Sequence, residues 1–105
     1  MSNRCTLVAE EDGAAVGFVE LESDGHLDML YLHKDAVGRG VGSRLYRAVE
    51  QIAWERGLGR IAIEASTTAR PFFERQGFRV VGEQAIALRG ARLTNFAMEK
   101  SLRRR

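Results

Sequence analysis

The stretch DAVGRGVGSRLY, from Asp35 to Tyr46, decides which fold the rest of the sequence indicates. Its three glycines alternate with Val37, Arg39 and Val41, and a helical pattern follows directly. Backbone N–H groups at the start of a helix attract anions, and glycine lets a phosphate come close to the backbone. The stretch therefore predicts a phosphate-binding turn at the mouth of a helix.

The residues before this turn predict strands, and those after it alternate between helix and strand. Apolar runs at 5–9, 14–22 and 26–33 are separated by turn residues and indicate an antiparallel meander. A helix is expected over about 41–56, ending at Gly57. Its apolar stripe should consist of Val41, Leu45, Ala48 and Ile52.

The last part of the chain predicts a strand, a short helix and a hairpin. The strand covers 60–65, and the helix lies within 67–77, with Thr67 or Thr68 as its cap. Two further strands flank Arg89 and Gly90. The expected fold is therefore α/β (α+β mixed), with the order β-β-β-α-β-α-β-β and a single, mostly antiparallel sheet.

Composition limits the classes of function. The chain has 105 residues and a formal net charge of +2, which suits one domain over 1–105 and argues against a nucleic-acid binder. Cys5 is the single cysteine, so no intramolecular disulfide can form. No apolar run is long enough for a signal peptide or a membrane span. We therefore expect a cytoplasmic protein with no nucleic-acid and no membrane partner.

Three familiar uses of a glycine-rich turn fit the sequence less well. A Walker-type loop needs a lysine before its Ser or Thr, but Ser43 and Arg44 follow Gly42. A dinucleotide-binding loop would need its third glycine at Ser43 or Leu45, and its fold opens with a parallel βαβ unit rather than a meander. A purely structural turn would not need three glycines, each of which costs backbone entropy on folding.

Two segments resemble the motifs of a known enzyme superfamily. LYLHKDAVGRGVGSRLYRAVE (30–50) resembles motif A of the GNAT superfamily of acetyl-CoA-dependent N-acetyltransferases. IEASTTARPFFERQGFRVV (63–81) resembles its motif B, and the YafP-like branch is the nearest in pattern. The motifs occur in the superfamily's order and spacing. The resemblance implies a GNAT-like fold and transfer of an acetyl group to the primary amine of a small molecule or a protein.

The resemblance also places acetyl-CoA on the chain. Its pantetheine arm would pair like an extra strand with the backbone of Leu30, Tyr31 and Leu32. Its pyrophosphate would lie on the backbone N–H groups of the turn, at the positive end of the helix dipole. Those N–H groups belong to Gly38, Arg39, Gly40, Val41, Gly42 and Ser43.

The sequence departs from the superfamily pattern at three points. Val37 stands where a Gln or Arg usually opens the loop. Phe73 stands where many members carry a Tyr that protonates the leaving thiolate, so water or another group such as Tyr31 would have to supply that proton. The usual first strand and two helices are lacking, which indicates a minimal GNAT domain, a fragment or a subunit completed by a partner. A sheet face without these helices should expose apolar surface, and we therefore expect a homodimer.

Deprotonation of the acceptor amine requires a general base, directly or through water. The strands beside the cofactor offer Glu20, Glu22, His26, Asp28 and His33, of which Asp28 and then Glu20 lie nearest to the predicted thioester. One cysteine and two histidines show no metal-ligand spacing, so no metal site is expected. The alternative to an active transferase is a degenerate GNAT module that binds acyl-CoA and regulates or pairs with a partner.

Overall fold

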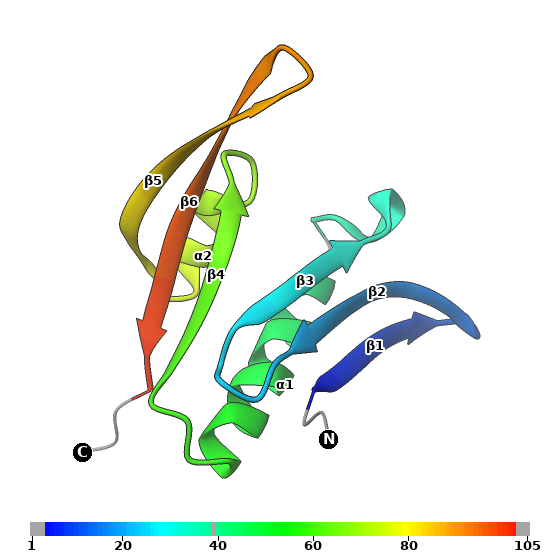
Figure 1. The fold of residues 1–105 in the computed structure, drawn as a ribbon. Coiled ribbons are helices and arrows are strands. Elements are labelled where there is room, and N and C mark those ends of the chain that lie inside the picture. Colours follow the sequence, from blue (N-terminus) through cyan, green and yellow to red (C-terminus); the bar gives the residue numbers. More distant parts are fainter. Residues whose placement is uncertain (1–3, 39, 103–105) are drawn as a thin grey trace.

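The computed structural model describes residues 4–38 and 40–102 and has the predicted element order, with one short 3-10 helix in addition (Figure 1). The elements of the first half are β1 (Cys5–Glu11), β2 (Ala14–Leu21), β3 (Leu27–Leu32), η1 (Lys34–Ala36) and α1 (Val41–Glu55). Those of the second half are β4 (Arg60–Ser66), α2 (Arg70–Arg75), β5 (Arg79–Leu88) and β6 (Ala91–Ser101). Within the described residues, no helix is long and apolar enough to cross a membrane.

The strands form two antiparallel sheets, so the prediction of a single sheet is wrong. The first has the order β1-β2-β3 and the second β4-β6-β5. They meet at an isolated parallel bridge between His26 and Ala62, and β3 and β4 diverge beyond it (Figure 1). Gly25 permits this close approach, because a Cβ there would collide with the carbonyl oxygen of Arg60. Such a seam depends on residues far apart in sequence and has no local signal.

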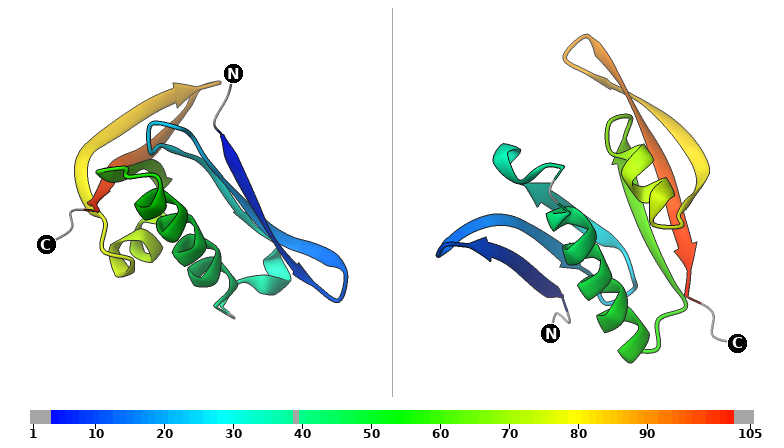
Figure 2. Two further views of the ribbon diagram at one scale, coloured as in Figure 1. Left: turned by 90° about the horizontal axis from the view of Figure 1, so that it is seen from below. Right: turned by 180° about the vertical axis from the view of Figure 1, so that it is seen from behind.

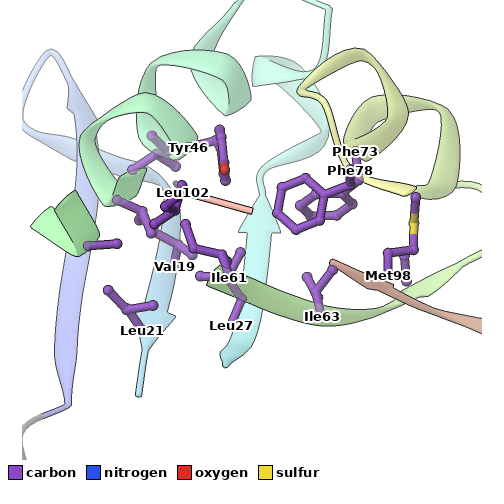
Figure 3. Close-up of a cluster of buried hydrophobic side chains, with 14 of the residues drawn as sticks. Val19, Leu21, Leu27, Tyr46, Ile61, Ile63, Phe73, Phe78, Met98 and Leu102 are labelled. Atoms are coloured by element: carbon purple, nitrogen blue, oxygen red, sulfur yellow. The ribbon is translucent and has the colours of Figure 1, made fainter. Parts of the chain in front are cut away.

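Both helices lie on the same side of the two sheets (Figure 2). α1 crosses the first sheet, and α2 lies against β4 of the second. Buried side chains from both sheets and both helices form one continuous core between these layers (Figure 3). Its largest members include Val19, Leu21, Tyr46, Ile61 and Phe73. The two sheets therefore share one apolar interior, although within the described residues a single isolated bridge joins one sheet to the other.

The buried face of α1 differs from the predicted stripe. Val41 and Leu45 are buried as expected and Ile52 is half-buried, but Ala48 is exposed. The rest of the buried face consists of Gly42, Tyr46, Val49 and Ala53. The reason is that α1 also faces the second sheet, where the ring of Tyr46 packs edge-on against Phe78 with centroids 5.5 Å apart.

Both helices end in a Schellman motif at a glycine. At the end of α1, the N–H of Gly57 donates to Trp54 and that of Leu58 to Ala53, both at 3.0 Å. Gly77 has φ +98° and ends α2 with the same pair of bonds. The threonine cap predicted for α2 is wrong: Ala69 is the N-cap residue, and its N–H donates to the Ser66 hydroxyl at 3.1 Å.

Candidate functional site

The turn before α1 has the backbone geometry that its glycines predict. Gly38 has φ +85° and Gly40, the N-cap residue, has φ +81°. A Cβ at either position would have no atom within 4 Å, so the space above both residues is open. The first turn of α1 contains no acidic side chain that could neutralise the helix dipole. The turn can therefore receive an anion on its backbone.

Gly42 has a different function from Gly38 and Gly40. A Cβ at Gly42 would lie 3.0 Å from Cδ1 of Leu32 and 3.3 Å from Cε1 of Phe72. Its lack of a side chain thus lets β3, α1 and α2 come together at one point. Leu32, Gly42 and Phe72 also line the pocket beside the turn, and this part of its lining is here called the pocket floor.

The turn, β3 and α2 line one pocket of about 610 Å³, a volume typical of ligand-binding cavities. It unites six of the nine residues predicted to bind the cofactor, which are Leu30, Leu32, Gly38, Gly40, Gly42 and Ser43. Of the other three, Tyr31 and Val41 do not line it, and Arg39 lies outside the described residues. The predicted residues from two separate segments thus meet in one cavity.

The wall contributed by α2 and the residues before it was not among the predicted site residues. It consists of Thr68, Ala69, Pro71, Phe72, Phe73 and Arg75. Two contacts hold it in place: Gln76 Nε2 donates to the Ser43 hydroxyl at 3.1 Å, and Phe73 packs edge-on against Phe78 with centroids 5.2 Å apart. The motif B resemblance covers this segment and was the available signal, but it does not show which side chains face the cavity.

Tyr31 and the two predicted bases lie on the face of the first sheet opposite α1, here called the outer face. Val19 and Leu21 are buried toward α1, so the alternation of β2 directs Phe18 and Glu20 outward. The ring of Tyr31 lies against that of Phe18, with centroids 5.6 Å apart. The pocket wall on β3 consists of Leu30 and Leu32 instead.

Glu20 and Asp28 share one counter-ion on the outer face. Arg4 Nη1 lies 3.6 Å from a Glu20 carboxylate oxygen and 3.3 Å from one of Asp28, and Nη2 lies 3.1 Å from Glu22. The Thr6 hydroxyl also donates to Glu20 at 3.3 Å. Neither Glu20 nor Asp28 lines the pocket. Their assignment as general bases stays a prediction.

His26 lies at the seam between the sheets. Its Nε2 is 2.7 Å from a Glu64 carboxylate oxygen, and its Nδ1 is 3.6 Å from Glu22. Partial burial lowers the pKa of His26, but the hydrogen bond to Glu64 and the charges of Glu64, Glu22 and Asp24 outweigh it, so the pKa lies above its ordinary value. His26 thus links β3 to β4 by a charge-assisted contact.

One group of side chains has the composition of a metal site. Glu22, His26 and Asp28 each offer a ligand atom, and these atoms lie within 4.8 Å of one another. Arg4 already supplies positive charge to Glu22 and Asp28. The group thus has its own counter-ion, and the expectation that no metal is bound stays a prediction.

Phe73 occupies the position at which the resemblance would place a proton-donating tyrosine. It is buried and packs edge-on against Phe72, with centroids 5.1 Å apart. A phenyl ring has no proton to donate to a thiolate. Tyr31, the alternative considered above, directs its ring to the outer face. The wall contributed by α2 therefore has no proton donor at this position.

Comparison with known proteins agrees with this geometry. The family model of the GNAT acetyltransferase domain matches residues 1–101. The chain is 37% identical over 91 residues to the N-acetyltransferase YafP of Escherichia coli, covering 87% of this chain and 57% of that protein. It is 32% identical over 60 residues to the N-acetyltransferase YjcF of Bacillus subtilis, covering 57% of this chain and 43% of that protein. The chain thus spans about half the length of these curated relatives.

Solved structures show the same fold. A GCN5-related N-acetyltransferase from Rhodopseudomonas palustris is 39% identical, with a TM-score of 0.86 over 94% of this chain and 62% of that one. An aminoglycoside 6'-N-acetyltransferase complexed with coenzyme A is 19% identical, with a TM-score of 0.81 over 97% of this chain and 74% of that one. The glycine turn, the divergent sheets and the family match together show that this chain belongs to the GNAT acetyltransferase family.

Proposed function

We propose that the protein is an acetyl-CoA-dependent N-acetyltransferase that transfers the acetyl group directly to a primary amine of a small molecule or a protein. The observation that carries the proposal is the pocket in which the glycine turn, β3 and α2 meet. The complex of a structural neighbour with coenzyme A supports the choice of cofactor. The sole thiol, Cys5, is consistent with a cytoplasmic location.

The chain's own residues would hold acetyl-CoA along three parts of the pocket. The space around Gly38 and Gly40 is open, and the N–H groups of the turn would receive the pyrophosphate. β3 pairs with β2 along one edge, and its other edge diverges from β4 beyond His26. That free edge at Leu30–Leu32 can pair with the amides of the pantetheine arm, while Leu30, Leu32 and Phe72 provide apolar contact.

In the transfer, the amine nitrogen attacks the thioester carbonyl, a C–N bond forms and the C–S bond breaks. The amine must first lose its proton, and we propose Asp28, with Glu20 second, as the base that accepts it. A backbone N–H of the Leu30–Leu32 edge would polarise the carbonyl. The thiolate takes its proton from water, because Phe73 offers none.

The second candidate is a module that binds acyl-CoA without transferring the acetyl group. Two observations favour it: the pocket wall has Phe73 in place of a tyrosine, and Arg4 pairs with both proposed bases. Release of free CoA thiol with a panel of amines would identify the transferase. Binding of acetyl-CoA without thiol release would identify the module.

Calorimetric titration of acetyl-CoA tests the binding step shared by both candidates. We expect one site per chain, and we expect Gly40→Asp to abolish binding because its carboxylate repels the phosphates. Gly40→Asn is the matched control, since Asn has nearly the same size and also tolerates positive φ. If both variants bind as the original protein does, the turn is not the phosphate site.

We also propose that the protein forms a homodimer through the outer face. Val8 and Tyr31 are 52% and 49% exposed there, and Phe18 lies between them in the strand register. Light scattering should give twice the mass of one chain, and Val8→Lys should shift the protein toward monomer. Val81→Lys, at a similarly exposed valine on β5, should leave the mass unchanged. A monomeric original protein would contradict the proposal.

A further inference from the structure

Arg75 carries the single charge among the described residues that line the pocket. It lies in the last turn of α2 and is exposed. Among the described residues, no carboxylate forms an ion pair with it. An arginine in this position can bind an anionic ligand without first giving up a partner within the protein.

The other arginine of α2 provides the contrast. Arg70 Nε lies 3.1 Å from a Glu74 carboxylate oxygen, and its guanidinium lies over the ring of Phe96 at 4.5 Å from the centroid. Arg70 is thus held by the fold, whereas Arg75 lines the cavity and, within the described residues, forms no ion pair. One helix therefore presents one structural arginine and one that can meet a ligand.

The position of Arg75 relative to the turn is also constrained. Its neighbour Gln76 donates a hydrogen bond to Ser43, in the first turn of α1, at 3.1 Å. This contact holds the end of α2 beside the positive end of α1. Arg75 therefore lines the same cavity as Gly38 and Gly40, close to the start of α1.

We infer that Arg75 binds the 3′-phosphate of coenzyme A and makes the pocket selective for CoA over dephospho-CoA; this rests on the proposed function. Backbone N–H groups suffice for the pyrophosphate, but the 3′-phosphate is a monoester with nearly two negative charges at neutral pH. A guanidinium can donate two parallel hydrogen bonds to such a group. Arg75 is the described lining residue that can neutralise it.

Calorimetric titration of CoA and dephospho-CoA into the original protein and Arg75→Ala separates this contact from others. The original protein should bind CoA roughly tenfold more tightly than dephospho-CoA, a preference that Arg75→Ala should remove with little change for dephospho-CoA. Arg75→Lys should keep part of the preference, and added salt should reduce it. Circular dichroism checks that the variants are folded.

Arg44→Ala is the matched control, because Arg44 is also exposed near the start of α1 but lines a different hollow with Val8 and Glu10. It should leave the preference for CoA intact. An equal loss for both ligands in Arg75→Ala would mean contact with the pyrophosphate and would overturn the inference. So would an unchanged preference, or its loss in Arg44→Ala instead. If the original protein binds neither ligand, the proposed function itself fails.

Discussion

At the scale of single residues, the glycines near the pocket have distinct physical tasks. Gly38 and Gly40 adopt positive φ below open space, whereas Gly42 is packed against Leu32 and Phe72. Substitutions should therefore affect binding and stability differently at these positions. The motif identifies all three as turn residues, but the contacts across α1 separate them.

Gly42→Ala should both destabilise the protein and weaken acetyl-CoA binding. Its methyl group would press on Leu32 and Phe72, and such overpacking costs about 1–3 kcal/mol of unfolding free energy. Urea unfolding and calorimetry measure the two effects. Gly59→Ala is the control, because Gly59 has open space and does not adopt positive φ, and it should change neither. Unchanged binding in Gly42→Ala would show that the pocket floor tolerates a methyl group.

Asp28→Asn should lower turnover far more than it lowers acetyl-CoA affinity. Loss of a general base reduces the rate by about 10²–10⁴, while Asp28 does not line the proposed cofactor pocket. Glu22→Gln is a matched control, since Glu22 shares the Arg4 contact but is neither of the two bases proposed above. Steady-state kinetics with saturating acetyl-CoA makes the comparison. Equal losses in the two variants would point to a structural role for the whole Arg4 cluster.

At the scale of elements, the two helix ends are specified by the same local chemistry. Each glycine follows the last helical turn and adopts positive φ, and its N–H and the N–H of the next residue each donate to a carbonyl of that turn. These bonds satisfy carbonyl groups that the helix leaves open. The start of α2 has no side-chain cap: Ala69 is its N-cap residue, and the N–H of Ala69 donates to the hydroxyl of Ser66 at the end of β4.

Gly57→Ala should reduce the free energy of unfolding by about 1–2 kcal/mol, because an L side chain is strained in the left-handed region. Gly57 has φ +73° and no atom within 4 Å of a Cβ, so strain is the only expected effect. Urea unfolding measures it. Gly57→Asn should lose less unfolding free energy, since Asn adopts the left-handed region more readily. If Gly57→Ala is as stable as the original, the Schellman end adds little to the stability of α1.

At the scale of the whole molecule, one shared core and one narrow seam hold the two three-stranded sheets together. The seam consists of the backbone bridge between His26 and Ala62 and the side-chain contact between His26 and Glu64. A protonated His26 strengthens that contact. Conditions that change its charge should therefore change how firmly β3 and β4 are held together.

The seam predicts a pH dependence of stability. Because the pKa of His26 is raised in the folded protein, the contribution of its protonated ring to the free energy of unfolding is complete below a histidine's ordinary pKa of about 6.5. This contribution is lost as the pH rises through the raised pKa of His26. Urea midpoints measured from pH 5.5 to 8.5 should show this loss. In His26→Gln the decline should be smaller, and an identical decline in both proteins would assign it to another group.

Much of the fold could be predicted from the sequence because its signals are local. Strand alternation, helical periodicity and turn residues indicated the element order, and the glycines at 38, 40 and 42 indicated the turn before α1. The same glycines, with Leu30 and Leu32, line one side of the pocket, and their part in cofactor binding stays a prediction. These features depend on the φ preferences and spacing of neighbouring residues.

Only the tertiary structure decided how those elements meet. It divided the strands into two sheets at Gly25, exposed Ala48 because α1 faces both sheets, and made α2 the second wall of the pocket. It also placed Arg75 in the lining of the same pocket as the glycine turn, while holding Arg70 on Phe96. The physical reason is that each outcome depends on packing between residues distant in the chain, which no local pattern encodes.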